Sequence, residues 1–162
     1  LKRFKATPLT AFEFLTAQLL SRLWLTLSIT SGVFLLAWLL LDVPVRGNPL
    51  ALFSVFACGA IALTCLGLII AARLSSQELA DGLLNLITWP MMFLSGVWFS
   101  TEGLQPWLQR AAELLPLTHV IEAARAVMFD GAGFLQIAPH LAILLGMAAV
   151  FLTVGARGFR WD

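Results

Sequence analysis

Charged residues are scarce in this sequence. Asp, Glu, Lys and Arg make up 12% of the 162 residues, hydrophobic residues make up 60%, and the mean hydropathy is +0.91. A soluble domain is about a quarter charged and about half apolar. The composition therefore excludes an ordinary soluble domain and predicts an integral membrane protein. The net charge of +1 gives no electrostatic reason to bind nucleic acid.

The motifs of several enzyme and nucleotide-binding classes are also missing. The chain has no G-x-x-x-x-G-K-[ST] phosphate loop, no C-x-x-C or other zinc-binding spacing and no G-x-S-x-G elbow. We therefore expect no catalytic residue, resident metal or cofactor. Cys58 and Cys65 stand on one apolar run, too far apart in a helix to form a disulfide, and are expected to be small packing residues. No signal peptide is visible after Leu1.

Four apolar runs predict four membrane-spanning helices. The first begins at a capping box, residues 10–13, and continues to about residue 41, or roughly 45 Å of helix against a hydrocarbon core of about 30 Å. A polar and small stripe on it is expected to pack on neighbouring helices. The stripe comprises Gln18, Ser21, Arg22, Ser28 and Gly32. The other expected spans are residues 50–72, 77–99 and 134–156.

Local signals define the ends of these spans. Asn48 can cap the second and Pro49 suits its first turn. Residues 75–78 form a second capping box before the third span, and Pro90 should kink that span. A stripe of Ser54, Cys58, Ala62 and Cys65 should allow another helix to approach the second span closely.

Two short amphipathic segments, residues 104–115 and 117–129, separate the third and fourth runs. Both are too short to cross a bilayer and both carry charge, so we expect them at the surface or partly inserted, capping the outer mouth of a transport path. His119 and Glu122 are three residues apart and can share a helix face as a metal or proton-relay pair, although a solvated face is the favoured interpretation. His140 is expected to be hydrogen-bonded or interfacial.

The distribution of Lys and Arg predicts the orientation. One side of the predicted membrane holds three of the 10, Arg46, Arg110 and Arg125, and the other holds the rest. Because the cytoplasmic side carries the excess of basic residues, both ends of the chain are expected in the cytoplasm.

Four stretches together resemble the C-terminal part of an ABC type-2 exporter permease, the membrane domain of ATP-driven exporters. Residues 1–14 (LKRFKATPLTAFEF) place a basic run before a T-P pair and a glutamate, and residues 89–99 contain P-x-x-F-L-S-G-x-x-F. Residues 104–119 (LQPWLQRAAELLPLTH) are similar to an L-P-x-W-L motif followed by L-P-L-T-H/Y, and residues 157–161 to a basic and aromatic tail. Ser100 and Thr101 stand where many members have a proline, which leaves the local turn open.

The resemblance implies an all-α, polytopic membrane helix bundle forming a single transmembrane domain over residues 1–162. Family members have six spans, so the first two would be absent from this chain. A separate ATPase subunit would bind and hydrolyse ATP, and a second permease, identical or different, would complete the path in the plasma (inner) membrane. Candidate ATPase contacts are Arg3, Lys5, Thr7, Pro8 and Glu13. Candidate residues of the outer gate or substrate path are Phe93, Ser95, Gly96, Trp98, Phe99, Pro116, His119 and Glu122.

The function implied is therefore export of a drug, lipid, polysaccharide or similar amphiphile, without catalysis by this chain. Two alternatives remain open. An ion-coupled transporter using His119, Glu122 or His140 would place ionisable groups inside the bilayer, whereas the centres of the predicted spans lack acids. A non-transporting membrane scaffold would have no ATPase partner.

Overall fold

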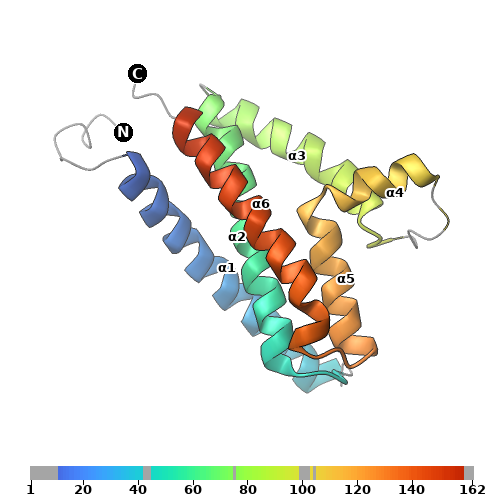
Figure 1. The fold of residues 1–162 in the computed structure, drawn as a ribbon. Helices are drawn as coiled ribbons and strands as arrows, with labels where there is room; N and C mark the ends of the chain where they lie inside the picture. Colours follow the sequence, from blue (N-terminus) through green and yellow to red (C-terminus); the bar gives the residue numbers. More distant parts are fainter. Residues whose placement is uncertain (1–10, 42–44, 75, 99–102, 104, 159–162) are drawn as a thin grey trace.

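The computed structural model describes residues 11–41, 45–74, 76–98, 103 and 105–158, and within these ranges the chain is helical without strands. Figure 1 shows the arrangement of the helices. They are α1 (Ala11–Leu41), α2 (Pro49–Arg73), α3 (Gln77–Leu94), α4 (Pro106–Glu113), α5 (Pro116–Phe129) and α6 (Phe134–Gly158).

Helix α2 lies at the centre of the packed core. It makes its most extensive contacts with α6 and further contacts with α5 and α1. Its buried face includes Ala51, Val55, Ala62 and Cys65, most of them small residues. Of the predicted small-residue stripe, Ala62 and Cys65 are buried in this face, whereas Ser54 and Cys58 are only partly buried. Within the described residues Cys58 and Cys65 are free thiols.

Three helices are long and apolar enough to cross a membrane. The qualifying segments are Thr16–Leu40 in α1, Pro49–Ile70 in α2 and Phe134–Gly155 in α6. The bounds of all three helices agree closely with those expected from the sequence. At the start of α2 the Asn48 side chain accepts a hydrogen bond from the Leu50 N–H (2.8 Å), and Pro49 occupies the first turn, as predicted.

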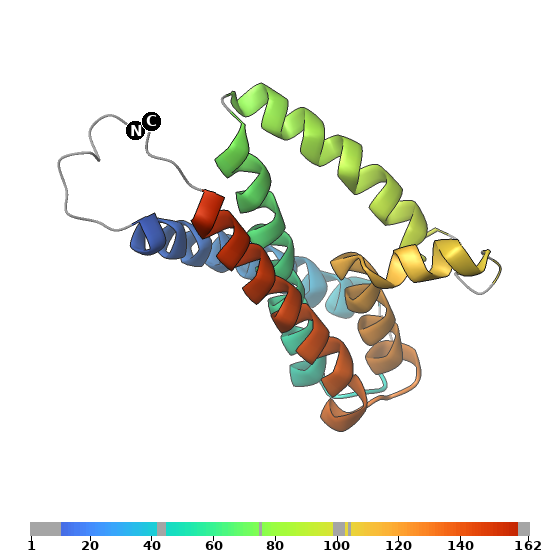
Figure 2. The same ribbon diagram turned by 45° about the horizontal axis from the view of Figure 1, so that its top comes forward.

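Helix α3 is not among these candidate spans, so the predicted fourth span is not confirmed. The helix has 18 residues and ends at Leu94, five residues earlier than expected, because the chain turns at Gly96 with φ 79°. Its N-cap is Ser76, whose hydroxyl accepts from the Leu79 N–H, and Pro90 lies within it. Figure 2 shows α3 running away from the α2–α6 core and meeting α4 at its far end.

Helix α1 contacts α2 and barely touches α6. Only 6% of its membrane-length segment is buried, and its exposed side chains include Trp24 and Trp38. The polar and small stripe on α1 was expected to pack on neighbouring helices. Within this chain Ser21, Arg22 and Ser28 are exposed and Gln18 is partly buried, so packing of this stripe on helices outside the chain stays a prediction. A Cβ added at Gly32 would meet nothing within 4 Å.

Candidate functional site

Helix α5 forms the inner wall of the candidate site. Half of its 14 residues are buried, namely Pro116, Thr118, His119, Val120, Ala123, Ala124 and Val127. They pack against α2 and α6. The expectation that this segment presents a solvated face is therefore wrong for His119, of which 7% is exposed. Polar residues at every third or fourth position of a helix do not indicate a solvent-exposed face when residues of another helix supply their hydrogen-bond partners.

A glycine sets the distance between α5 and α2. A Cβ added at Gly59 would lie 2.5 Å from Cγ2 of Val120, so no larger residue fits without movement. Gly59 lies ten residues after Pro49, or about 15 Å along the helix. The N-terminal half of α5 therefore lies beside the middle of α2.

The end of α5 is fixed to the segment that precedes α2. The Arg46 N–H donates to Met128 O (3.1 Å) and the Gly47 N–H to Val127 O (3.0 Å). The Arg46 side chain donates to Phe129 O (3.2 Å). A Cβ at Gly47 would lie 2.6 Å from Val127 O, so the two backbones approach as closely as only glycine allows.

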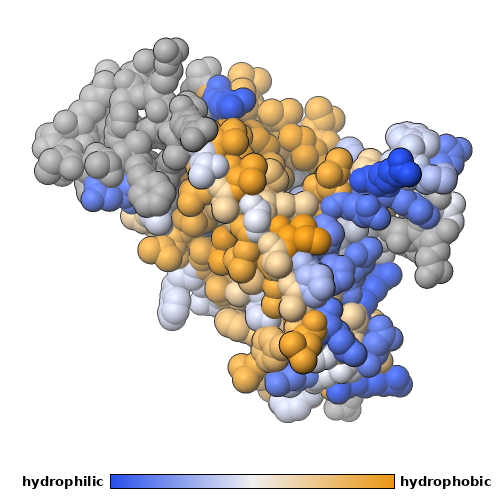
Figure 3. Space-filling model, viewed as in Figure 1, coloured by the Kyte–Doolittle hydropathy of each residue, from blue (hydrophilic) through white to orange (hydrophobic). Residues whose placement is uncertain are grey.

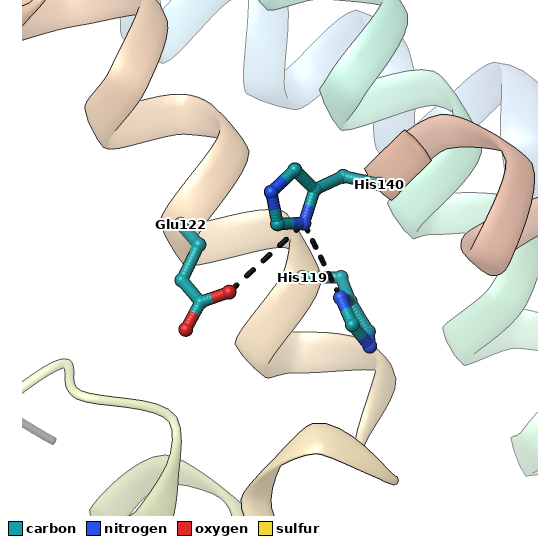
Figure 4. A group of neighbouring side chains, drawn as sticks. All are labelled: His119, Glu122 and His140. Carbon is teal, nitrogen blue, oxygen red and sulfur yellow. Dashed lines mark hydrogen bonds and ion pairs between the residues drawn. The ribbon is translucent and has the colours of Figure 1, made fainter. Parts of the chain in front are cut away.

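His119, Glu122 and His140 come together between α5 and α6. Figure 4 shows the His140 ring of α6 between the His119 and Glu122 side chains of α5. The two Nδ1 atoms are 3.3 Å apart, and His140 Nδ1 lies 4.0 Å from Glu122 Oε2. The His140 and Glu122 side chains are 29% and 45% exposed, so the cluster is buried on one side and open on the other.

Hydrogen-bond chemistry defines the His119 tautomer. His119 Nε2 lies 2.8 Å from Glu113 O, and a carbonyl oxygen can only accept, so Nε2 carries the proton. The neutral His119 ring then has its lone pair on Nδ1, facing His140. The prediction that His140 is hydrogen-bonded is confirmed.

The remaining candidate gate residues lie around the turn that follows α3. Ser95 and Gly96 are buried, whereas Phe93 and Trp98 are exposed. The Arg125 guanidinium of α5 donates to Gly96 O (2.6 Å), which ties this turn to α5. Phe99 lies outside the described residues.

The candidate ATPase contacts are mostly outside the described residues. Arg3, Lys5, Thr7 and Pro8 precede the described part of the chain. Glu13 is exposed in the first turn of α1. Arg46 and Gly47, which bind the end of α5, follow the other end of α1 (Figure 1).

Sequence reasoning missed three participants in this site: Arg125, Gly59 and the pairing of His140 with His119. Their partners are 29, 61 and 21 residues away, so no local spacing could reveal them. One signal was available for Glu122 and Arg125: both are charged residues in a mostly apolar helix, which is unusual for a lipid-facing segment.

Comparison with known proteins identifies the family. The ABC-2 type transporter membrane family matches residues 1–129, most of the chain. The chain belongs to this family. It is 29% identical over 94% of its length to the Escherichia coli inner membrane transport permease YhhJ, of which it covers 41%.

Two further relatives are resistance permeases. The chain is 28% identical to the daunorubicin resistance ABC transporter permease protein DrrB1 of Streptomyces coeruleorubidus, over 53% of the chain and 30% of that protein. It is 28% identical to the linearmycin resistance permease protein LnrN of Bacillus subtilis, over 70% of the chain and 30% of that protein. The chain thus spans less than half of the relatives it matches. No solved structure matches it.

Proposed function

We propose that this chain is part of the permease subunit of an ATP-binding-cassette exporter, driven by a separate ATPase subunit. Its family and its three lipid-length helices support this proposal. The names of two relatives, which concern daunorubicin and linearmycin resistance, agree with an amphiphilic drug-like substrate.

The position of α5 carries the proposal furthest. Val120 lies beside Gly59, and Gly59 is about 15 Å along α2 from its first residue. That distance is about half the thickness of a hydrocarbon core of roughly 30 Å. In a membrane, α5 would thus be a re-entrant helix. Its exposed residues include Glu122 and Arg125. Charged side chains at this depth face protein or water and not lipid.

The surface of the molecule supports the same assignment. Figure 3 shows an apolar surface over the middle of the molecule, whereas hydrophilic residues gather along the side formed by α4 and α5. We infer that this side faces the substrate path or a second permease, with the gate residues Phe93 and Trp98 nearby. The apolar surface of α1 would face lipid or other spans.

Helix α3 would complete the path as a fourth, shorter crossing. Its 18 residues extend about 27 Å. Glu78 lies in its first turn and Asp81 soon after, where headgroups and water solvate them. Both ends of the chain would then lie in the cytoplasm. The segment around Arg3, Lys5, Thr7, Pro8 and Glu13 would contact the ATPase there.

The test is ATP turnover by the complete permease assembled with its ATPase in liposomes. We expect Glu13→Ala and Pro8→Ala each to reduce ATP turnover at least about fivefold. This factor corresponds to about 1 kcal/mol, the lower end of typical coupling free energies between two sites. Asp130→Ala removes an exposed carboxylate at the opposite end of the bundle and should leave turnover unchanged. Normal turnover in both coupling variants would contradict the assigned contact.

A further inference from the structure

The two imidazoles between α5 and α6 are arranged like neighbouring ligands of a metal ion. In a tetrahedral site with bonds of about 2.0–2.1 Å to histidine nitrogen, adjacent ligand atoms are about 3.3–3.4 Å apart. His119 Nδ1 and His140 Nδ1 are 3.3 Å apart. The pair therefore already has the spacing of one edge of a zinc tetrahedron.

Glu122 lies close enough to be a third ligand. Its Oε2 lies 4.0 Å from His140 Nδ1, and the ligand atoms of all three residues lie within 4.8 Å of one another. The Glu122 side chain is 45% exposed, so it is free to rotate by the small distance that separates it from a bonding position. Figure 4 shows its carboxylate directed toward the His140 ring.

The surroundings of His119 prepare it to coordinate a cation. Its Nε2–H donates to Glu113 O at 2.8 Å, which leaves the Nδ1 lone pair directed into the cluster. Metal-binding histidines almost always donate their second ring N–H in this way, because the hydrogen bond fixes the tautomer and the ring orientation. His119 is buried, so its position is determined by packing as well.

We propose that His119, His140 and Glu122 bind a single Zn²⁺ ion, with the fourth position open to water on the exposed side. Two imidazoles and one carboxylate are ligands that zinc accepts, whereas Mg²⁺ and Ca²⁺ prefer oxygen alone. The ion joins α5 to the second turn of α6, two elements that are otherwise held by apolar packing and by the His119–His140 contact. This site is independent of the transport function proposed above.

The experiment is Zn²⁺ titration of the complete permease in detergent, purified with a tag that contains no histidine and stripped with a chelator. Calorimetry should show one Zn²⁺ bound per chain. His140→Gln and Glu122→Gln should each raise the Kd by at least about tenfold, since even changes behind the ligands cost that much. Both side chains are partly exposed, so both variants should fold. At the same Zn²⁺ concentration, the thermal midpoint should rise more for the wild type than for either variant.

Glu113→Gln is the matched control. It removes a nearby exposed carboxylate, yet its backbone carbonyl still accepts from His119. This variant should bind Zn²⁺ as the wild type does. Co²⁺ in place of Zn²⁺ should give the strong visible absorption of a tetrahedral site, lost in His140→Gln. Equal Zn²⁺ affinity in the wild type and both ligand variants, or no binding to the wild type, would overturn the proposal.

Discussion

The contact between Gly59 and Val120 predicts a strong and specific sensitivity to added volume. A methyl group at position 59 would lie 2.5 Å from Val120 Cγ2, about 1 Å closer than carbon atoms normally approach. Val120 is buried, and valine in a helix has one strongly preferred rotamer, so its methyl group cannot turn away at low cost. Gly59→Ala must therefore separate α2 from α5 or strain Val120.

A second glycine of α2 makes the magnitude measurable. Replacing glycine by alanine in a helix gains about 0.5–1 kcal/mol in backbone entropy, and overpacking a core costs about 1–3 kcal/mol. A Cβ at Gly67 would meet nothing within 4 Å, so Gly67→Ala reports the entropy gain alone. Gly59→Ala should thus be about 1–3 kcal/mol less stable than Gly67→Ala, a factor of roughly 5 to 150 in the unfolding equilibrium.

The assay is unfolding of the complete permease in mixed detergent and SDS micelles, followed by tryptophan fluorescence. Val120→Ala provides the second arm of a double-mutant cycle. Without the Val120 methyl groups, the atom nearest to a Cβ at position 59 would be the Cβ of residue 120, at 3.6 Å, which is an ordinary contact. The double variant should therefore be more stable than the sum of the single effects, by about 1–3 kcal/mol. Additivity within about 0.5 kcal/mol would refute the close approach of α5 to α2.

Two further predictions concern the end of the bundle where α5 meets the segment before α2. Gly47→Ala should destabilise the permease by more than about 3 kcal/mol relative to the wild type in the same SDS assay, which is more than Gly59→Ala. The reason is that its Cβ would lie 2.6 Å from the Val127 carbonyl oxygen, which belongs to the backbone and cannot move aside. Equal stability of Gly47→Ala and the wild type would contradict the hydrogen-bonded junction. With both native cysteines replaced by alanine, cysteines at the exposed positions Gly103 and Gly133 should react with a membrane-impermeant maleimide in intact cells, and one at Glu78 should react only after lysis; the reverse pattern would contradict the proposed orientation.

Helix positions followed from local signals and were largely predictable. Asn48 and Pro49 define the start of α2, and Gly131, with φ 70°, lies in the turn between α5 and α6. These signals act over a few residues, so a single sequence contains them in full. The end of α3 was less predictable, because the apolar run continues beyond Leu94 and only Gly96 marks the turn.

The burial of α5 could not be predicted in the same way. His119, Glu122 and Arg125 occur at helical spacing, which in isolation indicates a solvated face. In the structure His119 pairs with His140 and Arg125 binds Gly96 O, so these two side chains find their partners on other elements. Burial of a polar side chain depends on such distant partners, and spacing within one helix contains no information about them.

The distribution of contacts divides the chain into a fixed part and two attached parts. Helices α2, α5 and α6 form most of the core, to which α1 adds Leu19 and Leu23. Side chains of neighbouring helices approach Gly59 and Gly155 closely, and hydrogen bonds at Gly47 secure the end of α5. Helix α1 contacts mainly α2, and α3 has few contacts with the core beyond the hydrogen bond from Arg125 to Gly96. Tightly packed units resist deformation, so a change imposed on the ends of α1 and α3 would move these helices relative to the core. The proposed ATPase contact lies at the start of α1, and the candidate gate residues Phe93 and Trp98 lie at the far end of α3. Both proposed sites are therefore on helices that have few contacts with α5 and α6, and we expect these helices to move while α5 keeps its place in the core.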